Sequence, residues 1–393
     1  MIYSRIVGTG SFLPARVMDN NEFAQRLETS DAWIRERTGI ARRHIAAEGQ
    51  TSSDLALEAS RAALKTANVR AEEIDLIVVA TSTPDYVFPS TACQLQAKLG
   101  IKGCAAFDIQ AVCTGFIYAL AQGYAQIASG MADTVLVVGA EVFSRLLDWS
   151  DRSTCILFGD GAGAVVLSAS DEPGGALGVE MTTEPQGAYM IWLPAGGSKA
   201  PPSADTISRG EHYVRMEGNQ TYRFATKTMA TTALESIRRS GLAPEDIDLF
   251  IPHQANIRII EAVAKGLDLP MDKMFVNLDK YGNTSAASVP IALAEAVNEG
   301  HVKVGDNVVI VAFGAGFTSG AVTINWTADP ARGRAGDAAV RPEDVTVRAP
   351  VDWDSVDPIP DALAELMRRP GSIDVPLDDV APGEPERAHQ PVG

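Results

Sequence analysis

The sequence predicts an α/β protein whose two similar halves pack into one layered body. Short continuous apolar runs, such as 77–79 and 135–138, are typical of strands that are covered on both faces. Helical segments alternate with these runs, which indicates strands joined by crossover helices. Two separate pairs of motifs also recur at one common spacing, which indicates that the unit is duplicated.

The common spacing is 173 residues. The segment Glu-Ile-Asp-Leu at 73–76 matches Asp-Ile-Asp-Leu at 246–249, and residues 132–138 match residues 305–311 at the same distance. Chance similarity of amphipathic helices could produce one such match, but two matches at one spacing favour duplication. We therefore predict similar halves at 1–172 and 173–326.

The elements follow in order along each half. In the first half we predict a strand ending at 107–109, a strand at 164–167, and helices at 53–66, 92–99 and 114–128. In the second half we predict a late core strand at 308–313 and helices at 228–240, 258–266 and 286–298. Two insertions distinguish the first half, at 19–43, with Trp33 and Arg37 on an expected helix, and at 144–158 with Arg152.

The glycine-rich run at 159–163 resembles a nucleotide-binding loop only superficially. Such a loop precedes a helix, whose N-terminus binds phosphate, whereas this run precedes a strand. We interpret the run as a tight turn of a hairpin.

Composition narrows the class of partner and the compartment. The net charge of −17 argues against nucleic acid or an anionic membrane as a partner. No run of 18 apolar residues exists, and the N-terminus lacks an apolar signal segment, so we expect a cytoplasmic protein. The four cysteines show no Cys-x-x-Cys spacing and the five histidines are scattered, which makes a metal site or a disulfide framework improbable.

Residues 327–393 differ in composition from the rest of the chain. They contain ten prolines and carry a net charge of −7, and only 361–369 has the apolar spacing of a helix. We predict a disordered tail, either without a function of its own or serving as a docking segment for another protein.

Cys113 lies at the junction between the strand ending at 107–109 and the helix that begins at 114. The first N–H groups of a helix have no intrahelical partners and, with the helix dipole, favour negative charge. A thiol placed there is expected to ionise more easily than a free one, which makes Cys113 a candidate nucleophile. The alternative is a small buried hydrophobic residue, as most free cysteines are.

The repeat spacing places two further side chains beside this cysteine. Position 113 corresponds to Ala286, so a pseudo-twofold axis brings Asn283 towards Cys113. His253 corresponds to Ala80, at the carboxyl end of a core strand, where ligand sites lie. A thiolate can attack a thioester carbonyl, while an imidazole N–H and an amide N–H stabilise an enolate formed by loss of CO₂. Taken singly, His253 could instead cap a helix, and Asn283 could be an ordinary turn residue.

Five motifs also carry a family resemblance that spans residues 1–326. They are Ala-Val-Cys-Thr-Gly-Phe at 111–116, Phe-Gly-Asp-Gly-Ala-Gly at 158–163, His-Gln-Ala-Asn-Ile-Arg at 253–258, Gly-Asn-Thr-Ser-Ala-Ala-Ser-Val-Pro at 282–290 and Phe-Gly-Ala-Gly-Phe-Thr at 313–318. With them the chain resembles β-ketoacyl-acyl carrier protein synthase III, the initiating condensing enzyme of type II fatty acid synthesis. The resemblance implies a duplicated thiolase-like fold with α-β-α-β-α layers.

The resemblance also implies an activity: decarboxylative Claisen condensation of an acyl-CoA primer, expected to be acetyl-CoA, with malonyl-acyl carrier protein. Cys113 is the implied acylated nucleophile, and His253 and Asn283 the implied pair that promotes decarboxylation. The backbone N–H groups of Cys113 and Ala315 form the implied oxyanion hole. A homodimer without a metal or redox cofactor is implied.

Further residues are implied to bind substrates. Those implied to bind CoA are Trp33, Arg37, Arg152 and Asn256. Phe88 is similar to the residue that closes the acyl pocket across a dimer interface. A basic patch implied to dock the acidic carrier protein consists of Arg258, Arg223 and Lys265.

Three positions depart from the family pattern: Ala315 for a glycine, Ser319 for a frequent tryptophan and Gly266 for a possible lysine. These departures affect the expected acyl-chain preference and carrier affinity rather than the chemistry.

A degradative thiolase needs a second cysteine in the C-terminal half, which is absent. A hydroxymethylglutaryl-CoA synthase needs a glutamate base, for which we find no obvious candidate. A condensing or acyl-transfer enzyme of secondary metabolism remains an alternative, and an inactive carrier-binding scaffold is disfavoured by the intact Cys-His-Asn set.

Overall fold

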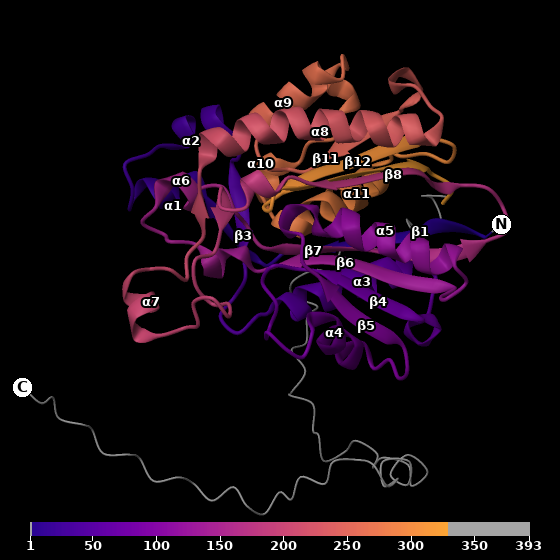
Figure 1. Ribbon diagram of the computed structural model, residues 1–393, viewed down its shortest axis with the longest axis horizontal. Helices are drawn as coiled ribbons and strands as arrows, with labels where there is room; N and C mark the ends of the chain where they lie inside the picture. Colours follow the sequence, from indigo (N-terminus) through magenta and orange to yellow (C-terminus); the bar gives the residue numbers. More distant parts are fainter. Residues whose placement is uncertain (1, 329–393) are drawn as a thin grey trace, which may run out of the picture. The chain divides into compact units, whose positions relative to one another are not determined.

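The computed structural model describes residues 2–328, which form two large β-sheets separated and flanked by helices, besides two short two-stranded sheets (Figure 1). The predicted disorder beyond residue 328 and the predicted helix at 361–369 lie outside the described residues. Within residues 2–328, none of the helices is long and apolar enough to cross a membrane.

The two sheets share one strand order. The first sheet runs β1 (Tyr3–Phe12), β7 (Gly161–Ser170), β6 (Thr134–Glu141), β4 (Leu76–Ala80) and β5 (Ala105–Ile109). The second runs β8 (Gly175–Thr183), β13 (Thr318–Asn325), β12 (Asn307–Gly314) and β11 (Leu249–Pro252). In each sheet the two strands that carry the repeated apolar motifs pair in parallel, β4 with β6 and β11 with β12. Strand β7 pairs antiparallel with β1 and β6, and strand β13 pairs antiparallel with β12 and β8.

The spacing of 173 residues holds for the elements around the centre. It relates the starts of β4 and β11, of β6 and β12, and of two inner helices, α5 (Gly115–Ala128) and α11 (Ser288–Glu299). The spacing fails at the edge of the second sheet, because the segment that corresponds to strand β5 is helix α10 (Leu278–Tyr281). On that edge, strand β11 makes an isolated bridge, between Phe250 and Met274. The division into domains at 172/173, which falls between β7 and β8, stays a prediction.

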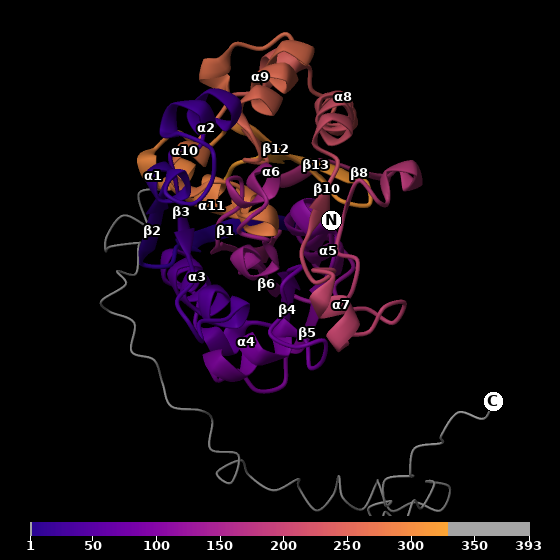
Figure 2. The same ribbon diagram turned by 90° about the vertical axis from the view of Figure 1, so that its left-hand side faces the viewer.

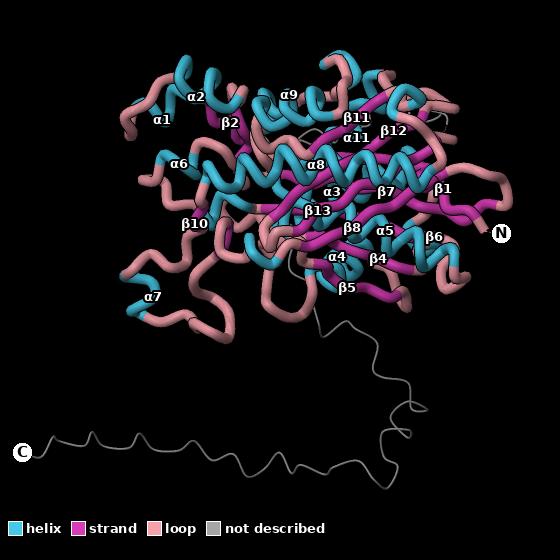
Figure 3. The backbone as a smooth tube through the Cα atoms, turned by 45° about the horizontal axis from the view of Figure 1, so that its top comes forward, coloured by secondary structure: helices cyan, strands magenta, loops and turns pink. Residues whose placement is uncertain are grey.

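The layers follow from where apolar faces are buried. Helices α8 (Gly218–Ser240) and α9 (Ile257–Gly266) cover the outer face of the second sheet, and α3 (Ser52–Ala67) and α4 (Thr91–Leu99) cover the outer face of the first (Figures 1 and 2). Helices α5 and α11 lie between the sheets and bury apolar side chains against both. The predicted α-β-α-β-α arrangement is confirmed. Figure 3 shows α8 running along β13 and β8.

The two insertions lie at one end of this body. The first contains β2 (Arg16–Asp19), α1 (Asn20–Ala24), α2 (Asp31–Thr38) and β3 (Arg42–Ile45), so Trp33 and Arg37 do lie on a helix. The second contains α6 (Arg152–Cys155). The remaining short elements are β9 (Ile191–Trp192), α7 (Ala204–Ser208) and β10 (Arg215–Met216).

Two local predictions were wrong. Gly161 and Gly163 lie within strand β7 and not in a hairpin turn. Glycine is needed in this strand because helix α11 crosses the sheet closely. A Cβ on Gly163 would lie 2.6 Å from the backbone nitrogen of Ile291. Helix α8 begins at Gly218, ten residues before the predicted start, because Thr221 and Ala225 continue its buried face.

Candidate active site

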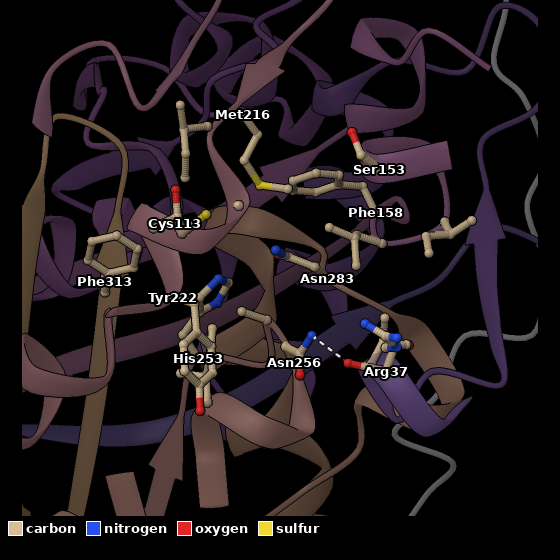
Figure 4. A pocket seen from close by; sticks show the side chains of 18 of the residues that line it. Arg37, Cys113, Ser153, Phe158, Met216, Tyr222, His253, Asn256, Asn283 and Phe313 are labelled. Carbon is tan, nitrogen blue, oxygen red and sulfur yellow. Dashed lines mark hydrogen bonds between the residues drawn. The ribbon is translucent and has the colours of Figure 1, made fainter. Parts of the chain in front are cut away.

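One cavity of about 240 Å³ collects residues from both halves and from the insertions. Cys113 lies in the single 3₁₀ turn η2 (Val112–Thr114) before α5, His253 directly follows β11, and Asn283 lies between α10 and the 3₁₀ turn η7 (Ser285–Ala287). All three line this cavity, and Figure 4 shows their side chains directed towards a common space. The carboxyl ends of β5 and β11 and the starts of α5 and α11 place them there.

The turn that carries Cys113 has an unusual backbone. Val112 has φ of 48°, in the left-handed region that β-branched residues rarely adopt. Its counterpart at the repeat spacing, Ser285, has φ of 49°. Neighbouring backbone is close: a Cβ on Gly314 would lie 3.0 Å from the Cys113 nitrogen, so the end of β12 needs glycine here.

The Cys113 thiol is almost fully buried, with 7% of the residue exposed. Its Sγ donates to the Ser285 hydroxyl over 3.6 Å. Burial raises the pKa of the thiol to about 12, although the Ser285 hydrogen bond favours the thiolate. The expectation of a readily ionised thiol is therefore wrong for the resting site, because desolvation outweighs the N–H groups of the helix start. A proton acceptor is needed when the thiol reacts.

His253 is buried and neutral. Burial lowers the pKa of its imidazole to about 3, so the ring carries no charge at neutral pH. Its Nδ1 shares a hydrogen bond with the Ser288 hydroxyl, and the Gln254 backbone N–H lies 3.4 Å from the same oxygen. When the Ser288 O–H donates to Nδ1, the ring proton resides on Nε2, which makes Nε2–H a hydrogen-bond donor.

Asn283 is held by its own backbone and by Ser285. Its N–H donates to Leu157 O over 2.9 Å, and its carbonyl accepts from Gly159 N over 3.0 Å. Its side-chain Oδ1 accepts from the Ser285 N–H over 2.8 Å. Because the amide oxygen is used in this bond, the amide NH₂ is the group left to bind a ligand oxygen in the cavity.

The same cavity contains the four residues that the sequence suggested for CoA. The Arg152 guanidinium carbon lies 4.7 Å from the centre of the Trp33 ring, and that of Arg37 lies 5.4 Å from it. Arg152 also donates to the Glu28 carbonyl. The Asn256 side chain donates to the Arg37 carbonyl over 3.1 Å, which joins α9 to α2.

Other suggested residues lie outside the residues that line this cavity. Ala315 is in the turn between β12 and β13, directly after the lining residue Gly314. Phe88 is 84% exposed in this single chain. The remaining three, all exposed on α8 and α9, are Arg258, Arg223 and Lys265. Arg258 stacks over Tyr222 at 5.7 Å, while Lys265 shares a depression with Glu261 and Asp268.

Sequence reasoning missed three residues that hold this site. Ser285 bonds Cys113 and Asn283, Ser288 bonds His253, and Glu141 bonds Ser285. The signal for Glu141 was available: a carboxylate follows six successive buried apolar or small residues at the end of a core strand. Ser285 and Ser288 were hidden in the small-residue run at 284–288, where nothing distinguishes a functional hydroxyl.

Comparisons with known proteins identify the family of the chain. Residues 107–185 match the family model for 3-oxoacyl-[acyl-carrier-protein] synthase III, and residues 237–326 match the model for its C-terminal part. The β-ketoacyl-[acyl-carrier-protein] synthase III of Caldanaerobacter subterraneus is 50% identical over 83% of this chain and 98% of its own length.

Solved structures give the same result. The 3-oxoacyl-[acyl-carrier-protein] synthase III of Aquifex aeolicus is 46% identical, with a TM-score of 0.76 over 82% of this chain and all of its own. The priming β-ketosynthase of the R1128 polyketide pathway is 34% identical, with a TM-score of 0.77 over 84% of this chain and 97% of its own. By its sequence, its layered fold and these relatives, the chain belongs to the β-ketoacyl-acyl carrier protein synthase III family.

Proposed function

We propose that this protein joins an acyl-CoA primer to malonyl-acyl carrier protein and so starts fatty acid synthesis. The observation that carries the proposal is the meeting of Cys113, His253 and Asn283 in one cavity that also contains Trp33 and Arg152. Acetyl-CoA is the proposed primer. The proposal includes a homodimer in the cytoplasm that needs no metal or redox cofactor.

The first proposed step is acyl transfer. Cys113 Sγ attacks the thioester carbonyl carbon of the primer, and the carbon–sulfur bond to CoA breaks. The negative charge that develops on the carbonyl oxygen is stabilised by the backbone N–H groups of Cys113 and Ala315. The products are an acyl-cysteine and CoA.

The second proposed step is decarboxylation and condensation. The thioester oxygen of the malonyl group accepts hydrogen bonds from His253 Nε2–H and the Asn283 amide, so electrons from the breaking carbon–carbon bond collect in an enolate as CO₂ leaves. The enolate carbon then attacks the acyl-cysteine and releases the thiol. A neutral His253 suits this role, because a donor is needed and a base is not.

We place the adenine of CoA between Trp33 and Arg152. Arg37 and Asn256 then contact the rest of the CoA molecule. An inserted ring needs about 7 Å between its neighbours, which is two contacts of about 3.5 Å. The guanidinium of Arg152 lies only 4.7 Å from the Trp33 ring centre, so this arginine has to swing away when CoA binds.

The remaining contacts are also part of the proposal. The acidic carrier protein docks on Arg258, Arg223 and Lys265, and the Arg258 guanidinium lies over the aromatic ring of Tyr222. Phe88, whose side chain is exposed in one chain, closes the acyl pocket of a second copy in the homodimer.

The test is intact-protein mass spectrometry after mixing with a panel of acyl-CoAs. The expected result is a single acyl adduct in the native protein that is absent from Cys113→Ser. Absence of an adduct with every acyl-CoA contradicts the proposed function.

A second candidate is the priming of a secondary-metabolite pathway with a different acyl group. The similarity to the R1128 priming ketosynthase favours it, as does Ala315, whose methyl group changes the turn beside the nucleophile. The same panel separates the two, because the acyl-CoA that loads fastest identifies the primer.

A further inference from the structure

Glu141 is a buried carboxyl group that the proposed reaction does not yet use. It ends strand β6 and has no exposed surface. Its Oε1 and Oε2 lie 3.2 and 3.1 Å from the Ser82 N–H, and Oε2 accepts from the Thr83 hydroxyl over 2.6 Å. A carboxyl group buried this deeply is costly unless it is hydrogen-bonded, so its place at the end of a core strand calls for a role.

A continuous chain of hydrogen bonds joins this carboxyl group to the nucleophile. Cys113 Sγ donates to Ser285 Oγ over 3.6 Å, and Ser285 Oγ donates to Glu141 Oε1 over 3.0 Å. Both bonds run in the same sense, from the thiol towards the carboxylate. The geometry is that of a two-step proton path between groups from the two halves of the molecule.

The other groups in the site do not offer an equivalent acceptor. His253 is neutral and its Nδ1 is bonded to Ser288, while the pKa of its ring is lowered to about 3. Burial raises the pKa of Glu141 to about 7, opposed by its hydrogen bonds, so both of its protonation states are accessible near neutral pH.

The groups that face Glu141 from neighbouring elements are mainly neutral. After β4 they are the hydroxyl groups of Thr81 and Thr83 and the N–H of Ser82. From η7 they are the hydroxyl of Ser285 and the N–H of Ala286. Cys113 is the titratable side chain at the other end of the path, and the carboxylate charge in turn disfavours its thiolate.

We propose that Glu141, acting through Ser285, receives the proton of the Cys113 thiol during acyl transfer and returns it during condensation. The inference rests on the proposed function of Cys113 as the acylated nucleophile. Glu141 is a positioning and proton-storing residue, because it does not touch the substrate.

The steps balance as follows. As Sγ bonds to the acyl carbon, its proton passes to Ser285 Oγ, the Ser285 proton passes to the Glu141 carboxylate, and CoA leaves as a thiolate. The acyl-enzyme then contains a neutral thioester beside a neutral carboxylic acid, so no isolated charge is buried. When the enolate displaces the Cys113 thiolate, the protons return along the same path and the carboxylate is regenerated.

The test uses iodoacetamide, which alkylates cysteine thiols and so probes Cys113 without an acyl-CoA. The rate of alkylation of the peptide containing Cys113 is followed by mass spectrometry from pH 5.5 to 9.5, with exposed Cys93 in the same sample as an internal reference. In the native protein we expect the Cys113 rate to rise through an inflection near neutral pH.

Two substitutions interrupt the path at different points. Glu141→Gln removes the acceptor, and Ser285→Ala removes the relay while leaving Glu141 in place. At pH 7.5 we expect each to slow alkylation by about a hundredfold, the lower end of what positioned proton transfer contributes. The neutral inflection disappears in both, whereas Glu141→Asp, which keeps a carboxylate, retains it.

Asp160→Asn is the matched control. Asp160 is another fully buried carboxyl group, with bonds to the Ala46 N–H at 2.7 Å and the Ser144 hydroxyl at 2.6 Å, and it is outside the path. We expect its variant to keep the neutral inflection at Cys113. A Glu141→Gln protein with faster alkylation, or with a uniformly lower rate and an unchanged inflection, overturns the proposal. If the native protein shows the neutral inflection in the alkylation rate of Cys113 but no acyl-CoA loads it, the result contradicts the proposed function and not the proton path.

Discussion

The two halves of the molecule present the same backbone turn and opposite chemistry. In the first half, η2 carries Cys113 in front of α5; in the second half, η7 carries Ala286 at the equivalent position in front of α11. Both turns begin with a residue at positive φ, Val112 and Ser285. The first presents a nucleophile. The second contributes the Ser285 hydroxyl, which accepts from Cys113, and the Ser285 N–H, which donates to the side chain of Asn283. Duplication built the scaffold, and divergence of a few side chains made it a site.

The largest effect should come from the residue that most distinguishes the halves. Cys113→Ser replaces a thiol by a far weaker nucleophile, so we expect complete loss of the acyl adduct in intact-protein mass spectrometry. Cys155→Ser is the control, because Cys155 is also buried and free but does not line the cavity. An adduct that persists in Cys113→Ser and vanishes in Cys155→Ser would show that Cys113 is not the acylated residue.

Removing the contribution of the second half should separate the two steps. His253→Ala and Asn283→Ala each delete a donor to the enolate oxygen, so we expect condensation to fall by about 10²–10³-fold. Primer loading at Cys113 should remain, because acyl transfer does not use these donors. The measurement is release of CO₂ from malonyl-acyl carrier protein beside the mass of the acyl-enzyme. Normal condensation by either variant contradicts this division of roles.

The contact between the halves can be tested through stability. A Cβ on Gly139 of β6 would lie 2.4 Å from the Ala286 carbonyl, so Gly139→Ala forces η7 away from the first sheet. We expect the free energy of unfolding to fall by about 3 kcal/mol, the upper end of the usual cost of overpacking. Gly197→Ala is the control in urea unfolding, because a Cβ there meets nothing within 4 Å. Equal midpoints for the two variants disprove the tight contact.

A smaller effect is expected at the insertion that only the first half has. Arg152→Ala removes the guanidinium that stacks on Trp33, and we expect KM for the acyl-CoA to rise about tenfold, as for loss of about 1.4 kcal/mol. The rate at saturation should stay the same. Arg209→Ala removes an exposed arginine paired with Glu211 outside the cavity and serves as the reference. A fall in kcat with unchanged KM excludes a binding role.

The smallest effect is the pH dependence of folding stability, which has opposite signs for His253 in the second half and Glu141 in the first. The pKa of His253 is lowered to about 3 on folding, so the unfolded chain binds more protons below pH 6.5 and stability falls as pH decreases through that range. The pKa of Glu141 is raised to about 7, so the folded chain binds more protons above pH 4.5 and stability falls as pH rises towards 7. His253→Gln should therefore lose less Tm than the native protein between pH 6.5 and 5. Glu141→Gln should lose more over the same interval. Identical shifts in both variants contradict the assigned signs.

Much of the scaffold was readable because its signals are strong. The strands at 77–79 and 135–138 are entirely buried, so their sequences contain almost no polar residues. The repeat spacing related Cys113 to Ala286, and from that relation the sequence predicted that His253 and Asn283 lie near the cysteine. Motifs covering 1–326 supplied the family.

What the sequence did not reveal depends on packing. Desolvation of Cys113 is a property of the surrounding side chains and reversed the expected ease of ionisation. The glycines of β7 indicated a turn, because the approach of α11 that requires them involves residues more than 120 positions away. The replacement of a fifth strand by α10 was likewise invisible, since four residues that end a sheet and four that form a helical turn differ little in pattern.

The paired turns at Val112 and Ser285 have a consequence for how such enzymes diversify. A residue with left-handed φ at the start of a turn that leads into a helix is the difficult part to build, and residues 2–328 contain two such turns. The second copy presents only a methyl group, at Ala286. The difference between the two copies at this position, a thiol in one and a methyl group in the other, is therefore a change of side chain on the same main-chain turn. New activities in this architecture are therefore separated by side-chain substitutions rather than by new folds.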